Sequence, residues 1–142
     1  MSYAVTRNSI LSALLSRIEQ IELVLGYPIG IAHENDSFDP TGYKMWLAYA
    51  YTPTTSESMG KIDTDSDDER GFFQVSCYIE TGNQTLYNEQ LAFFDMLKSE
   101  FKSGSLKNAV IIDSATINGG RTQDNYFVRD MTINYKTFIK RV

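Results

Sequence analysis

Two alternating segments on either side of an acidic stretch constrain this chain most. From Tyr43 to Tyr51 large apolar side chains occupy every second position, and a similar alternation returns from Gly71 to Glu80. A period of two residues is typical of a β-strand, whose successive side chains point to opposite faces. The stretch between them, Pro53–Arg70, carries six acidic and two basic side chains, a net charge of −4. We therefore predict two strands that pair as a hairpin around this stretch.

The first of these strands is apolar on both faces. Met45, Leu47 and Tyr49 lie on one face, and Trp46 stands among small residues on the other. One layer of helices covers one face of a sheet, so the second face needs another cover. A neighbouring subunit would supply it, and the nine tyrosines of the chain suit such an interface. Helices or loops of the same chain would do so equally well.

Helical spacing appears twice. Ile10, Leu14, Ile18, Ile21 and Leu25 recur at intervals of three or four residues, and Gly26 follows as an end signal. A second helix is expected at about Thr85–Lys102 with Thr85 as its N-cap, and further extended segments at 29–34, 108–117 and 125–139. The sequence thus predicts a single α+β domain over residues 1–142, with a mixed or antiparallel twisted sheet and two helices packed on it. The expected order is α-β-β-β-α-β-β.

The acidic stretch, at about residues 53–70, cannot bury enough apolar surface to order itself alone, so we expect a mobile loop or an extended hairpin tip. Asp63, Asp65 and Asp67 match positions one, three and five of a calcium-binding EF-hand loop. Asp68 stands where that loop needs glycine, however, and Gln74 where it needs glutamate. A specific calcium site is therefore not expected, although loose divalent binding by the stretch stays open.

The composition provides few of the side chains that catalysis or metal binding needs. A net charge of −5 argues against a protein that binds the nucleic-acid backbone, because such binding needs clustered Lys and Arg. One cysteine and one histidine argue against a disulfide, a zinc site and most acid–base catalysis. No nucleophile elbow or phosphate loop is present. We expect no enzyme activity, no metal and no cofactor, and the absence of a targeting or membrane-spanning segment favours a reducing, cytoplasm-like compartment.

The charges are distributed unevenly. The last fourteen residues carry +3, opposite in sign to the acidic stretch. Opposite charges in one chain suit head-to-tail contacts between subunits, which close into rings. The candidate interface residues are Trp46, the acidic Asp63, Asp65, Asp67, Asp68 and Glu69, and the basic Arg129, Lys136, Lys140 and Arg141.

The order of these features resembles a known family. The opening helix leads to Ile31–Pro40, with an Asn and a Phe-x-Pro, and then to an aromatic strand that ends in Thr52-Pro53 and a polar loop. Arg70–Val75 follows as an Arg-Gly-x-Phe-Gln-Val start of a strand, and a helix like Thr85–Lys102 and a last strand ending in Tyr135 complete the pattern. Over almost the whole chain this resembles the tail terminator proteins of long-tailed bacteriophages, similar to minor tail protein U.

The resemblance implies a structural virion protein without cofactor or turnover. Family members form a homo-hexameric ring on the last ring of tail tube protein, stop tube growth and present a surface to the head-completion or neck protein. It also implies a place in the virion tail, with assembly in the host cytoplasm. The acidic stretch would then face the lumen or the tube, or be solvated without a role. A head–tail neck connector of similar fold and a non-viral adaptor domain are the alternatives.

Overall fold

The structure, a computed structural model, describes residues 3–58, 66–107 and 110–140, and describes only the backbone at 3–4, 55–58, 66–69 and 138–140. The predicted α+β class and order of the main elements are confirmed, with two further short strands, β4 and β6. The elements are α1 (Tyr3–Leu25), β1 (Gly30–Ala32), β2 (Met45–Ser58), β3 (Ser66–Glu80), α2 (Gln84–Glu100), β4 (Leu106–Lys107), β5 (Val110–Ile117), β6 (Arg121–Gln123) and β7 (Tyr126–Lys140).

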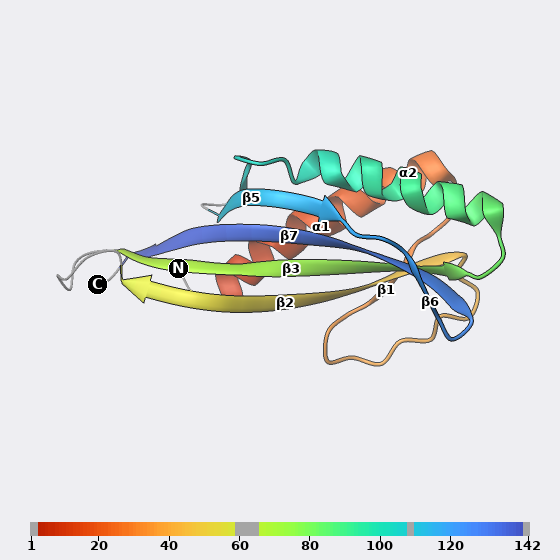
Figure 1. The fold of residues 1–142 in the computed structure, drawn as a ribbon, viewed down its shortest axis with the longest axis horizontal. Helices are drawn as coiled ribbons and strands as arrows, with labels where there is room; N and C mark the ends of the chain where they lie inside the picture. The colour runs from red at the N-terminus through yellow and green to blue at the C-terminus, as the bar shows by residue number, and fades with distance from the viewer. Residues whose placement is uncertain (1–2, 59–65, 108–109, 141–142) are drawn as a thin grey trace.

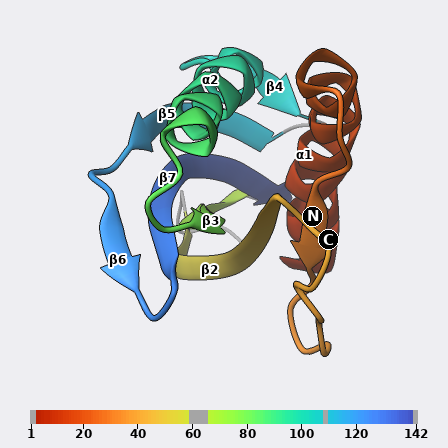
Figure 2. The same ribbon diagram turned by 90° about the vertical axis from the view of Figure 1, so that its right-hand side faces the viewer.

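One mixed sheet contains all the described strands. Its order is β1-β2-β3-β7-β5-β4, and β6 pairs with β7 beyond the end of β5 (Figure 1). β1 runs parallel to β2, and every other pair is antiparallel. The long strands β2, β3 and β7 form the middle of the sheet, and Figure 2 shows the sheet curling from β2 through β7 to β5.

The two helices pack together and bury one face of the sheet. The predicted stripe of α1 is buried from Ile10 to Ile21 and partly buried at Leu25, and α2 adds Phe93, Phe94 and Leu97 to the same core. The strands contribute alternate residues, from Met45 to Tyr49 in β2 and from Phe73 to Ile79 in β3. Fully burying a side chain of this size contributes about 1.5–3 kcal/mol, so this shared core holds the helices on the sheet.

Several bounds differ from the predicted ones: α2 ends at Glu100 rather than Lys102 and β1 covers Gly30–Ala32 rather than 29–34, and two further differences have a structural reason. β2 and β3 run further into the acidic stretch, as an extended hairpin, with a register shift between Pro53 and Thr55. Pro53 is tolerated because β1 pairs with β2 only from Trp46 to Ala48, so the missing N–H interrupts no second described ladder. The N-cap of α2 is Asn83, not Thr85, because its extended backbone lets Oδ1 accept a hydrogen bond of 3.0 Å from the N–H of Leu86.

Candidate assembly surfaces

The sheet face opposite the helices is the first candidate surface. The side chains that alternate with the core, at 46–50 in β2 and 72–78 in β3, are partly or fully exposed on their even-numbered positions. Both helices belong to the core on the other side, so neither covers this face. We call it the open face. Of the covers considered from the sequence, the two helices are therefore excluded, and among the described residues the loop before β2 packs on the face at Trp46.

That end holds an aromatic cluster. The rings of Trp46 and Tyr78, paired across β2 and β3, stack with centroids 3.9 Å apart and planes 6° from parallel. Tyr126 meets both rings edge-on, at 5.6 and 6.1 Å. The loop before β2 carries Phe38, whose ring centroid lies 5.3 Å from that of Trp46. The same ring stacks on Tyr43. The predicted interface residue Trp46 thus belongs to a cluster of five aromatic side chains and has ring contacts with three of them, Phe38, Tyr78 and Tyr126.

Beside the cluster the surface is hollowed. A cavity of about 680 Å³ lies between the loop at 40–44, the start of α2 and the turn at 125–126, with Trp46, Lys44 and Glu80 among its lining. Gly30 allows the ring of Phe38 to pack against the backbone of β1, because a Cβ at residue 30 would lie 2.7 Å from that ring. The lining of this hollow combines aromatic rings with the cation of Lys44 and the carboxylates of Glu80 and Glu89, and aromatic residues are enriched at protein–protein interfaces.

Two buried polar atoms on the open face lack hydrogen-bond partners within the described residues. One is Nε1 of Trp46, and the other is Oδ1 of Asp130, which is 7 % exposed. The second carboxylate oxygen of Asp130 accepts a charge-assisted hydrogen bond from Arg121. An unpartnered buried donor or acceptor costs about 1–3 kcal/mol.

The predicted basic residues do not form one group. Arg129 pairs in register with Cys77 on the helix side, where its Nη1 donates a hydrogen bond of 3.2 Å to the carbonyl oxygen of Asn118. Its guanidinium also lies 5.7 Å from the centroid of the Phe127 ring. Lys136 lies on the other side of β7, with its Nζ 3.7 Å from Oδ1 of Asp113. The structure therefore separates these two cations, although they share one strand.

The acidic stretch and the basic tail lie at the same end of the sheet. By backbone register Asp67 and Asp68 pair with Ile139 and Phe138, and Ser66 pairs with Lys140. The other predicted residues are Glu69, which pairs with Thr137, and Asp63, Asp65 and Arg141, which lie outside the described residues. The opposite charge of the two segments thus belongs to backbones that are already neighbours within each subunit. It no longer argues by itself that these two segments meet between subunits.

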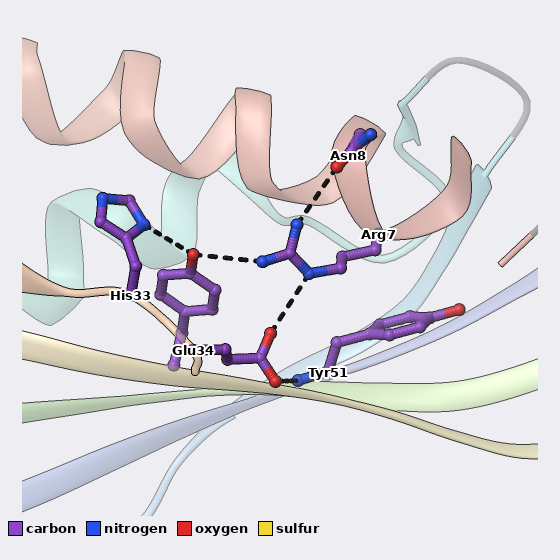
Figure 3. A network of polar contacts seen from close by, with 6 residues as sticks. Arg7, Asn8, His33, Glu34 and Tyr51 are labelled. Carbon is purple, nitrogen blue, oxygen red and sulfur yellow. Dashed lines mark hydrogen bonds and ion pairs between the residues drawn. The ribbon is translucent and has the colours of Figure 1, made fainter. Parts of the chain in front are cut away.

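A polar network that the sequence analysis did not find ties the start of α1 to the sheet (Figure 3). Arg7 donates to Oε1 of Glu34 at 3.2 Å and to the hydroxyl oxygen of Tyr49 at 3.3 Å. That hydroxyl lies 2.7 Å from Nδ1 of His33, and Oε2 of Glu34 accepts from the N–H of Tyr51. Burial raises the pKa of Tyr49, and Arg7 opposes that shift. The network holds the start of α1 against β1 and β2.

Within the described ranges the structure groups no three His, Cys, Asp or Glu side chains that could hold a metal ion. Over the same residues it contains no helix with the length and hydropathy that crossing a membrane requires.

The fold is similar to that of a solved structure. A solved structure matches with a TM-score of 0.64 and 18 % sequence identity, over 92 % of this chain and 94 % of its own. No curated protein sequence matches the chain. The fold and its surfaces thus define a small α+β domain with an uncovered aromatic sheet face. The family model described as phage tail terminator protein matches residues 9–135, so the chain belongs to the phage tail terminator family. The resemblance inferred from the sequence is confirmed, and with it a structural role in the phage tail.

Proposed function

We propose that this protein forms a homo-hexameric ring on the end of the tail tube, stops the addition of tube subunits and presents the surface to which the head or neck attaches. The membership of the family supports the tail role. The observation that carries the ring is the open face. Trp46, Tyr78 and Tyr126 lie there without a helix above them. A subunit or tube contact over this face would bury aromatic surface.

The proposal assigns no turnover to the protein. Its described acidic and basic side chains act as contacts: Lys136 and Arg70 around Asp113 at one end of the open face, and Arg121 with Asp130 near its middle. Such ion pairs on a rim set orientation and salt dependence more than affinity. Assembly should therefore weaken with added salt without being abolished by it.

Native mass spectrometry at low salt, with and without short tail tubes, tests the ring. We expect a species of six protomers, free or seated on a tube end. Seating on the head instead of the tube would favour the neck connector. A protein that stays monomeric and binds neither structure would favour an adaptor domain and contradict the proposal.

A further inference from the structure

The cavity beside the aromatic cluster is lined by a carboxylate that has no cation of its own. We call this hollow the Glu80 cavity, because Glu80 forms no ion pair with another described residue. Glu89, the second acidic residue of the lining, accepts a hydrogen bond from Tyr27, and the ammonium of Lys44 lies 5.2 Å from the centroid of the Tyr27 ring. Tyr43 of the same lining is 41 % exposed. The Glu80 cavity therefore suits an occupant that combines an apolar group with a cation.

The turn that follows α2 has that composition. Residues 98–107 carry three lysines and one glutamate. Glu100 is paired with Lys107 at 2.6 Å. Lys98 and Lys102 are exposed and form no ion pair within the described part of the chain. Leu106, four residues after Lys102, is 65 % exposed. The turn at 102–106 thus presents an unpaired ammonium and an apolar side chain to solvent.

We propose that the 102–106 turn of one copy docks in the Glu80 cavity of a second copy. Lys102 then pairs with Glu80, and Leu106 packs on the exposed ring of Tyr43. Charge complementarity argues for a second copy as the occupant, because the same chain holds an unpaired carboxylate in the cavity and an unpaired ammonium on the turn. This contact rests on the proposed ring and is one of its subunit contacts.

The turn cannot reach the cavity of its own subunit. Thr85 and Leu86, at the start of α2, line the Glu80 cavity, and the turn begins after α2 ends at Glu100. The axis of α2 rises about 24 Å from its first to its last residue, at 1.5 Å per residue. A lysine side chain is much shorter than this distance, and Figure 1 shows α2 lying along the sheet with its two ends apart. The two halves of the contact must therefore come from different copies.

A turn of one copy in the cavity of another is a contact between unlike surfaces. Such a contact repeats from subunit to subunit and closes into a ring when the rotation permits. Each subunit offers one cavity and one turn, at opposite ends of α2. Every subunit of a ring can therefore make the same two contacts.

The apolar half of the contact is tested through Trp46, which lines the Glu80 cavity and is the only tryptophan of the chain. Ring assembly should shift its fluorescence to shorter wavelength, because the docked turn removes water from the cavity. Leu106→Ser should abolish that shift and lower the ring yield at least fivefold. The midpoint of urea unfolding should stay unchanged, because Leu106 is exposed in the free subunit. A Leu106→Ser protein that assembles like the wild type overturns the contact.

The charged half is tested by reversals in separate subunits. Lys102→Glu and Glu80→Lys should each lower the yield of six-protomer rings at least tenfold in native mass spectrometry, because like charges then meet at every contact. Mixed in equal amounts, with one variant carrying a heavy-isotope label, they should recover rings of three subunits of each kind. In that mixture every turn meets a cavity of opposite charge. Circular dichroism of each variant checks that it is folded.

A pair of double variants supplies the matched control. Lys102→Glu with Glu80→Lys in one chain should restore the ring yield, whereas Lys102→Glu with Glu19→Lys, which reverses an exposed glutamate of α1 outside the cavity, should not. Full yield in a single reversal, or no recovery in the mixture of folded variants, overturns the contact and leaves the proposed function intact. A wild-type protein that forms no ring even on tube ends overturns the ring, and the contact with it.

Discussion

The indole of Trp46 lies flat on the phenol ring of Tyr78, with ring centroids 3.9 Å apart. The two residues face each other across the β2–β3 hairpin on the side that no helix covers. Cross-strand aromatic pairs add about 0.5–1.5 kcal/mol beyond the area that they bury. This pair therefore stabilises the hairpin in the free subunit and also exposes aromatic surface to a partner.

Trp46→Ala should lower the free energy of unfolding by about 2 kcal/mol, because it removes the stack on Tyr78 and the contact with Phe38 while the site is only half-buried. Urea unfolding followed by circular dichroism measures the change. Trp46→Phe keeps a ring in place and should cost less than about 1 kcal/mol. An alanine variant as stable as the wild type would show that the stack contributes nothing to the fold.

Gly71→Ala should destabilise the protein by about 1–3 kcal/mol, because the added methyl group would overpack the centre of the sheet. A Cβ at Gly71 would lie 2.4 Å from the carbonyl oxygen of Thr52 and 2.7 Å from the hydroxyl of Tyr135. Gly119→Ala is the matched control, since no atom lies within 4 Å of its Cβ. Thermal unfolding of both variants decides the matter: equal melting temperatures would contradict the close packing described at Gly71.

Arg121→Ala should cost about 1.5–3 kcal/mol, the range for a hydrogen bond to a charged group, because it leaves the buried carboxylate of Asp130 without its cation. Asp130→Asn in the same background should recover part of that loss, since a neutral amide is cheaper to bury than an unpaired charge. The four proteins of this double-mutant cycle are compared by denaturant unfolding. Purely additive effects would mean that the two side chains do not interact in solution.

The protein should lose stability in alkali through Tyr27. Burial and the hydrogen bond that Tyr27 donates to Glu89 raise the pKa of this phenol in the folded state. The unfolded chain, with a phenol pKa of about 10, releases the proton first, so the free energy of unfolding falls as the pH rises above about 10.

Tyr27→Phe should make that alkaline fall shallower, although it removes a hydrogen bond worth about 1 kcal/mol at neutral pH. Urea unfolding at a series of pH values measures the slope. Tyr43→Phe, which removes a phenol hydroxyl from an exposed side chain, should keep the wild-type slope. If both variants followed the wild-type curve, the raised pKa of Tyr27 would not contribute to folding.

The sequence predicted what local periodicity encodes. Alternation in the two hairpin strands and the spacing of Ile10, Leu14 and Ile18 identified buried positions, because a strand or a helix repeats its buried face at a fixed period. The boundaries were less accurate: the strand ladder continues past Pro53 through a register shift, which no pattern of single residues announces.

Contacts between distant segments could not be read from the sequence. The bond between Arg7 and Glu34 exists because β1 runs parallel to β2 and brings residue 34 under the start of α1. The separation of Arg129 from Lys136 follows from strand parity, which puts 129 and 136 on opposite faces. Because both side chains are positive, the sequence suggested that they form one group. Residues that are seven positions apart on a strand point to opposite faces, however.

The central claim is that this protein ends the tail tube as a ring. Electron microscopy of tails assembled with and without it tests that claim most directly, by the distribution of tube lengths and the appearance of tube ends. We predict tubes of one length with a six-fold ring at the end when the protein is present, and overlong tubes without that ring when it is absent. The same length distribution in both preparations would contradict the account.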